Sequence, residues 1–487
     1  MNMDLKQRGV SVWQALLGCT AFCAALLILA LVRFIDENAY WPILENLMYP
    51  WAAALAFPLL RLDAVPKRRG MVFLFGFFLW YIVICYLNRQ YSFFQHVYDW
   101  YMLLFAMFLF YPQDSSIPRS TLLHRVRVIL SIFLGAWSFM CLVALYAAVQ
   151  RILIVTPSSF FGFDGGRLFV SCHPNSVGYL CAVSFLFALF LAGQGKRAAR
   201  IVFGLDAALM YVCLALTDSR TSIVAFCVGA ALLSFSAIWG CLSRFPRWPR
   251  RILCASAAGL LCLLSFVGMR GVFSFYVRIP APSVIEAAQA NAVEAISPTA
   301  EESPGVAALI SPTPDAPPAS DIPSSEPAAP APETPRPLGD QAGGLNGRVP
   351  MWTAALRMVR DHPIYLLTGV TRIGVWESVG AYEPWLYSVA SLHNAYLYTF
   401  VSCGLPGILL LLGFAIVVAP RAWKLLFGAL GRPRRGLRAL PIILCVLCII
   451  SFNEDLLFLS NNVSNILFFF AAGLVMYFSD PSQIEEA

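Results

Sequence analysis

The sequence contains little charge. Only 13% of its 487 residues are Asp, Glu, Lys or Arg, whereas 59% are hydrophobic and the mean hydropathy is +0.70. An ordinary soluble chain is about one quarter charged and about half apolar. Because this chain has half of the usual charge, it cannot cover a set of water-soluble domains, and lipid must solvate most of it. The composition excludes a soluble protein and predicts an all-α, polytopic integral membrane protein.

Lysine is also scarce, with four lysines against thirty arginines. The net charge of +7 does not indicate nucleic-acid binding, because the basic residues follow the expected membrane topology. The fourteen cysteines lie in apolar stretches or at their edges, without the spacing of a metal site. We therefore expect them to be small packing residues and not disulfides or metal ligands. No small-residue cleavage site follows the first apolar run, which we expect to be a membrane span.

The apolar runs and the basic residues together predict the topology. A span needs about 20 mostly apolar residues, and about twelve runs qualify: 13–32, 43–60, 71–88, 96–112, 128–149, 176–193, 201–217, 221–240, 252–269, 395–419, 440–457 and 460–478. With both termini in the cytoplasm, the cytoplasmic connections hold 22 of the 34 basic residues, including all four lysines. Excess positive charge marks the cytoplasmic side. We predict twelve transmembrane helices with both termini inside.

One connection is much longer than the others and divides the chain. Residues 1–269 hold the first nine predicted spans, residues 270–392 form a large outer loop, and residues 393–487 hold spans ten to twelve and a cytoplasmic tail. Residues 281–347 carry nine acids and one arginine and are crowded with Pro, Ala and Ser. Such a segment buries too little apolar area to offset its ordering entropy, so we predict disorder. We expect residues 348–392 to be folded over the membrane, because Met351–Arg360 has an amphipathic helical pattern that ends before Pro363.

Two arginines on the predicted outer side are candidates for anion binding. Arg220 lies at the mouth of span eight, where a charge near lipid is costly and therefore indicates function. The alternatives are interfacial placement of its side chain or a local pair with Asp218. Arg348 begins the folded part of the loop, and its guanidinium fork suits bidentate phosphate binding. The alternative for Arg348 is an ordinary structural role in the loop.

Histidine is rare, with five residues in the chain, and His393 is the sharpest candidate for catalysis. It stands where a helix begins and continues into span ten. A neutral imidazole accepts a proton near pH 7, which suits a general base. The alternative is that His393 caps the helix or lies at an interface. His173 precedes span six and has the same two interpretations, a site role or a helix cap shared with Asn175.

The motif around His393 resembles that of a known family. His393-Asn394 is followed by nine residues, Gly404, two residues and Gly407. Ser219-Arg220 at the start of a span and the segment from Arg348 through Trp352 to Pro363 accompany it. Together these features resemble the bacterial O-antigen ligase and polymerase superfamily over roughly residues 170–410. The resemblance implies a fold like that of metal-independent glycosyltransferases of the GT-C type.

The resemblance also implies roles for individual residues. His393 activates an acceptor hydroxyl, and arginines at positions 220 and 348 hold the pyrophosphate of an undecaprenyl-linked glycan, with no nucleotide or metal. Asn394, next to the histidine, is a further candidate for substrate binding. The chain departs from the family after Asp361-His362-Pro363, where Gly369-Val370-Thr371-Arg372-Ile373-Gly374 replaces the usual Gly-x-Gly turn. This departure makes Arg372 a secondary candidate for phosphate contact.

Several functions remain open at this point. The resemblance implies an enzyme of the bacterial inner membrane with its active site on the outer face. A ligase would use lipid A core or another envelope acceptor, whereas a polymerase would extend the growing glycan. A flippase or transporter should show two matching halves with broken helices, and no such repeat is evident. A purely structural envelope protein leaves the polar residues His393 and Arg220 without a role.

Overall fold

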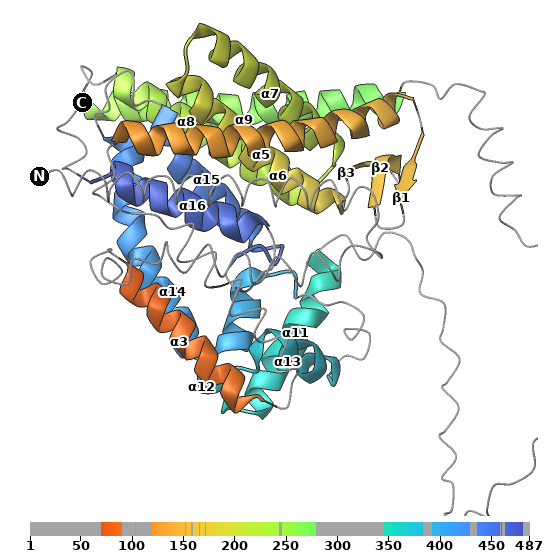
Figure 1. The fold of residues 1–487 in the computed structure, drawn as a ribbon, viewed down its shortest axis with the longest axis vertical. Coiled ribbons are helices and arrows are strands. Elements are labelled where there is room, and N and C mark those ends of the chain that lie inside the picture. The colour runs from red at the N-terminus through yellow and green to blue at the C-terminus, as the bar shows by residue number, and fades with distance from the viewer. Residues whose placement is uncertain are drawn as a thin grey trace, which may run out of the picture. The chain divides into compact units, whose positions relative to one another are not determined.

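The computed structural model describes the larger part of the chain, and most of that part is helical (Figure 1). The described residues are 70–89, 103, 119–150, 152–156, 159–164, 166–170, 172–242, 246–278, 345–382, 392–428, 436–457, 459 and 463–480. One unit comprises residues 1–280 with 348–487, and residues 281–347 form another. The predicted spans at 13–32 and 43–60 and nearly all of 96–112 lie outside the described residues. The predicted disorder of residues 281–347 also lies outside the described residues, except at 345–347, where the prediction is wrong because these residues form the start of a helix, α11 (Leu345–Asp361).

Six of the described helices are long and apolar enough to cross a membrane. They are α5 (Arg119–Val149), α6 (Pro174–Gln194), α7 (Arg197–Leu216), α8 (Arg220–Cys241), α9 (Arg247–Arg278) and α14 (Ala395–Phe427). Three shorter apolar helices are α3 (Met71–Leu87), α15 (Ala439–Ile450) and α16 (Val463–Phe478). Each coincides with one of the predicted spans. The prediction of a mostly helical, polytopic membrane protein is confirmed, while the count of twelve spans stays a prediction.

A small antiparallel sheet corrects the all-α prediction. Between α5 and α6, strands β1 (Ile154–Thr156), β2 (Ser159–Asp164) and β3 (Arg167–Val170) pair in the order β1-β2-β3. Asp164 pairs with Arg167, and the two-residue connection between them includes Gly166, whose φ of 77° suits a tight hairpin. Strands of three to six residues are too short to stand out from the hydropathy of the neighbouring spans, which is why the sequence did not predict them.

Three helices occupy the described part of the predicted folded segment 348–392, and the first of them begins three residues before it. They are α11 (Leu345–Asp361), α12 (Tyr365–Thr368) and α13 (Thr371–Gly380). Met351, Ala354, Ala355 and Met358 form the buried face of α11. The helix ends immediately before His362-Pro363, so the predicted amphipathic helix and its end are confirmed.

Helix α14 is broken at Gly404, where the backbone has φ 65° and ψ −176°. A Cβ atom at Gly404 would lie 2.4 Å from the carbonyl oxygen of Leu367, and one at Gly369 would lie 2.3 Å from that of Ser402. The two glycines therefore let the end of α12 approach the break in α14. The break frees carbonyl groups, and two of them find donors: Val370 N–H donates to the Val401 carbonyl at 3.0 Å, and Trp80 Nε1 to the Cys403 carbonyl at 2.8 Å.

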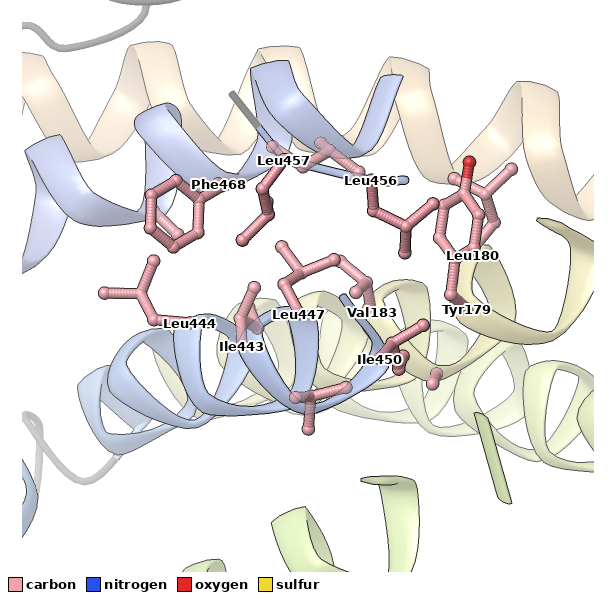
Figure 2. Packing of buried hydrophobic residues seen from close by; sticks show 14 of the residues in the cluster. Tyr179, Leu180, Val183, Ile443, Leu444, Leu447, Ile450, Leu456, Leu457 and Phe468 are labelled. Carbon is pink, nitrogen blue, oxygen red and sulfur yellow. The ribbon is translucent and has the colours of Figure 1, made fainter. Parts of the chain in front are cut away.

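Helix α15 is shorter than the predicted span at 440–457, because it ends at Ile450. Residues 451–457 are irregular, and the polar run Asn453-Glu454-Asp455 lies within them. Leu456 and Leu457 are buried in an apolar cluster with Ile443, Leu447 and Ile450 of α15 (Figure 2). This packing holds the irregular segment, which we call the 451–457 segment, at a fixed place beside α6 and α15.

Candidate functional site

Glu454 is the centre of a polar cluster that the sequence did not predict. Its Oε1 accepts hydrogen bonds from Asn175 Nδ2 at 2.8 Å and Arg348 Nη2 at 3.1 Å, and its Oε2 lies 3.4 Å from His393 Nδ1. The side chain of Glu454 is 14% exposed. Its partners come from α6, from α11 and from the residues preceding α14. The fold thus brings two predicted site residues, His393 and Arg348, to one carboxylate.

The charge state of Glu454 follows from these partners. Burial by itself disfavours the ionised carboxylate and acts to raise its pKa. The hydrogen bond from His393, the positive charge of Arg348 and the hydrogen bond from Arg348 act in the opposite direction and outweigh burial, so the pKa of Glu454 lies below its ordinary value. The carboxylate is therefore ionised at neutral pH and can only accept hydrogen bonds.

His393 adopts a left-handed backbone conformation with φ 48°. Such a conformation costs a non-glycine residue roughly 1–3 kcal/mol and persists only where its surroundings enforce it. Hydrogen bonds on both sides supply that enforcement. Trp352 Nε1 donates to the Leu392 carbonyl at 2.9 Å, Asn394 N–H donates to Asp455 Oδ1 at 2.8 Å, and Ala395 N–H donates to the Ser451 carbonyl at 2.9 Å. The predicted catalytic residue is therefore one of three described non-glycine residues with this kind of backbone strain, together with Asp218 and Thr371.

Asn394 and not His393 provides the N-terminal cap of α14. The Asn394 side-chain oxygen accepts hydrogen bonds from Tyr396 N–H at 3.1 Å and Leu397 N–H at 3.0 Å. This is the usual way in which asparagine satisfies the first free amides of a helix. Because its oxygen is used in the cap, only the amide nitrogen of Asn394 is left for the predicted contact with substrate, and that contact stays a prediction.

Arg167 on β3 extends the cluster and was not singled out from the sequence. Its Nη2 donates to Asn175 Oδ1 at 2.6 Å, and its Nε donates to the Thr217 carbonyl at 2.8 Å. Burial lowers the pKa of the Arg167 guanidinium, and the nearby charge of Arg220 acts in the same direction. One indication of a role for Arg167 was present in the sequence, namely its place among the arginines of the predicted outer side.

His173 takes the capping role that the sequence left open. It is the N-cap of α6, and its Nδ1 accepts a hydrogen bond from Asn175 N–H at 3.3 Å. Burial lowers the pKa of His173, and the charge of Arg167 adds to this effect. A neutral ring is the form that can accept the hydrogen bond of the cap. The side chain of Asn175 turns instead toward Arg167 and Glu454.

Arg220 is the first residue of α8 and is exposed. The possible local pair with Asp218 does not form, because Asp218 pairs with Arg270 of α9 at 2.8 Å. No hydrogen bond or ion pair joins the Arg220 side chain to any other residue that the structure describes. Its guanidinium therefore keeps its donors for other partners.

Arg372 lies on α13 outside the contacts that define the cluster. Its backbone N–H donates to the Tyr81 hydroxyl at 3.3 Å, and its carbonyl accepts from the Tyr398 hydroxyl at 3.0 Å. These contacts tie α13 to α3 and α14. Neither involves Glu454, so a role of Arg372 in phosphate binding stays a prediction.

Comparison with known families finds a match over part of the chain. Residues 205–412 match the family model described as O-antigen ligase. The chain carries an O-antigen ligase domain. The matched range includes Arg220, Arg348, Arg372 and His393, whereas Glu454 lies beyond it. A search of curated proteins finds no match. The resemblance inferred from the His393 motif is thus confirmed over residues 205–412, and a domain of this family implies glycosyl transfer of the ligase or polymerase type.

Metal-ligating side chains do not cluster in the described part of the ligase domain or elsewhere in the described ranges. No group of three or more His, Cys, Asp or Glu side chains there is arranged to hold a metal ion. The chemistry available at the cluster is that of the His393 imidazole, the Glu454 carboxylate and the guanidinium groups of Arg348 and Arg167. These groups can move a proton and bind an anion.

Proposed function

We propose that this protein transfers a glycan from undecaprenyl pyrophosphate to an acceptor hydroxyl at the outer face of the bacterial inner membrane. The observation that carries the proposal is the meeting of His393 and Arg348 at one polar cluster, because both belong to the O-antigen ligase domain. The acceptor is lipid A core or another molecule of the cell envelope. A polymerase of the same superfamily would use the growing glycan as its acceptor and the same chemistry.

The proposed reaction needs one base and a cationic site for the leaving group. The acceptor oxygen attacks the anomeric carbon, and the bond from that carbon to the pyrophosphate oxygen breaks. The pyrophosphate leaves with the electron pair, and the acceptor proton passes to His393. General base catalysis of this kind contributes about 10²–10⁴-fold. Pyrophosphate is already a good leaving group, so we expect no metal or nucleotide to be required.

The arginines are proposed to bind the pyrophosphate in two ways. Arg220 is exposed and has no partner among the described residues, so its guanidinium fork suits direct phosphate contact. Arg348 donates to the Asn453 carbonyl and to Glu454, so its terminal nitrogens are already engaged. We expect Arg348 to act mainly through its charge. We assign Arg372 and Asn394 to secondary contacts with the substrate.

The test is a transfer assay with purified protein, undecaprenyl-pyrophosphate glycan and separate candidate acceptors. Extension of lipid A core identifies a ligase, whereas extension of the glycan itself identifies a polymerase. His393→Ala and His393→Gln should bind the donor normally and lose nearly all turnover, because an amide hydrogen-bonds but takes up no proton. His362→Ala is the matched control, since His362 is exposed at the end of α11. A near-normal rate in His393→Gln would remove the base from the mechanism.

A second set of variants tests the arginines. Arg220→Ala should weaken donor binding, measured directly with the labelled lipid donor. Arg220→Lys should restore only part of it, because lysine keeps the charge and loses the fork. Arg357→Ala is the control, because Arg357 is exposed on α11 and takes no part in the cluster. Equal donor affinity in Arg220→Ala and Arg357→Ala would contradict the proposed phosphate contact.

A further inference from the structure

We infer that Glu454 is a positioning residue for His393, holding the proton on Nδ1 so that Nε2 is the atom that accepts the acceptor proton. This inference deepens the proposed function and rests on it. Glu454 touches neither the donor nor the acceptor in this scheme. It lies outside the range that matches the family model, so the match itself assigns it no role.

The geometry fixes which nitrogen of the ring carries the proton. A neutral imidazole has one N–H group and one nitrogen with a free lone pair. Because Oε2 of Glu454 faces Nδ1 at 3.4 Å and a carboxylate can only accept, the proton belongs on Nδ1. The lone pair is then on Nε2, at the other side of the ring. A distance of 3.4 Å is long for such a bond, and contacts of this kind tighten when the ring becomes positive in the reaction.

The other oxygen of Glu454 is held in a way that keeps the carboxylate ionised and oriented. Asn175 and Arg348 both donate to Oε1, which leaves Oε2 for the imidazole. The charged or titratable groups around this carboxylate are His393, Arg348 on α11, Arg167 on β3, and His173 with Tyr179 at the start of α6. The cationic members of this set favour the ionised form of Glu454.

The same short segment also positions the backbone of His393. Ser451 and Asp455 accept hydrogen bonds from the amides of Ala395 and Asn394, on either side of Glu454 in the sequence. The 451–457 segment therefore sets both the strained backbone of His393 and the direction in which its ring faces a carboxylate. A residue that only neutralised Arg348 would not require this alignment with the histidine.

The decisive variants change Glu454 while retaining its size or its charge. Glu454→Gln should lower kcat by at least about tenfold and should leave the KM for the lipid donor nearly unchanged. The loss should not exceed the contribution of base catalysis itself, which is about 10²–10⁴-fold. Glu454→Asp keeps a carboxylate one methylene further from the ring and should recover part of the lost kcat. Glu377→Gln is the control, because Glu377 is exposed on α13.

A double-mutant cycle separates positioning from a structural role. In a His393→Gln background, Glu454→Gln should cause little further loss of the residual rate, because there is no base left to position. Equal losses in both backgrounds, or a loss that appears in donor KM and not in kcat, would overturn the inference. Either result would indicate that Glu454 serves only to hold and neutralise Arg348. If Glu454→Gln fails to fold by size-exclusion chromatography, Glu454→Asp carries the test, and an unchanged kcat overturns the inference.

The cycle also distinguishes this inference from the proposed function. A near-normal rate in His393→Gln overturns the base itself and the positioning role with it. An inactive His393→Gln with a normal Glu454→Gln overturns only the positioning role. An inactive His393→Gln with reduced kcat in Glu454→Gln and non-additive losses supports both.

Discussion

Replacing Gly404 by alanine should destabilise the protein more than replacing any other glycine of α14 by alanine. Gly404 has φ 65° and ψ −176°, a region of backbone space that is open almost only to glycine. A Cβ atom there would lie 2.4 Å from the Leu367 carbonyl oxygen and 2.9 Å from that of Leu366. Both obstacles are backbone atoms, so no side chain can turn aside to make room.

The magnitude follows from two contributions. Forcing alanine into this conformation costs roughly 1–3 kcal/mol, and inserting a methyl group into a filled space costs roughly another 1–3 kcal/mol. We expect a loss of about 3 kcal/mol or more in the free energy of unfolding. That is more than about a hundredfold in the equilibrium between folded and unfolded protein. Gly369→Ala should act similarly, because its φ is 61° and its Cβ would meet the Ser402 carbonyl.

The assay is thermal unfolding of the detergent-purified protein, followed by size-exclusion chromatography of heated samples. Gly204→Ala is the matched control, because Gly204 lies within helix α7 and an added Cβ there meets nothing within 4 Å. Alanine in a helix interior is favoured over glycine by about 1 kcal/mol, so this variant should melt at or above the wild-type temperature. A Gly404→Ala protein that melts with Gly204→Ala would refute the reasoning about the break in α14.

Three further predictions concern other parts of the chain. Deleting residues 283–340 should leave membrane insertion and transfer activity mostly intact, and complete loss of activity in a well-inserted deletion would make the loop a working part. Cysteine-accessibility labelling should place residues 281–347 outside and the positions of the lysines inside, namely Lys67, Lys196 and Lys424. Because the pKa of Glu454 is lowered from its ordinary value of 4.5, its ionised form stabilises the fold above about pH 4.5, and this contribution is lost as the pH falls through the lowered pKa. The difference in melting temperature between wild type and Glu454→Gln should shrink below that pH, and a constant difference would contradict the assigned charge state.

Much of the fold was predictable because lipid imposes a simple rule on sequence. A helix that crosses a bilayer needs a long apolar run, and α5, α6, α8 and α14 each coincide with such a run. Local chemistry also predicted the end of α11, because a proline after the amphipathic run removes a backbone donor and disfavours continuation of the helix. The His393 motif was sufficient to indicate the O-antigen ligase family, because its residues are close together in the chain.

The sheet and the end of α15 were not predictable by the same rule. Hydropathy over a window of about twenty residues averages out three short strands, and it also averaged Asn453-Glu454-Asp455 into a span. Helix α15 ends at Ile450, and the polar run that follows is held in place by Leu456 and Leu457 in the core. Only the packing of α15 against α6 and α16 decided that these polar residues leave the helix.

The sequence by itself determined which chemical groups this protein has, and the tertiary structure decided which of them meet. A motif identified His393, and a place at the mouth of a span identified Arg220. Composition placed both in a membrane protein, and the resemblance of the motif indicated the ligase family. Spacing carried no information about Glu454, because 61 residues separate it from His393 and 106 from Arg348. Pairings over such separations depend on how helices pack in three dimensions. The fold therefore assigned the helix cap to Asn394, paired Asp218 with Arg270, and set a buried carboxylate against the histidine that the motif had singled out.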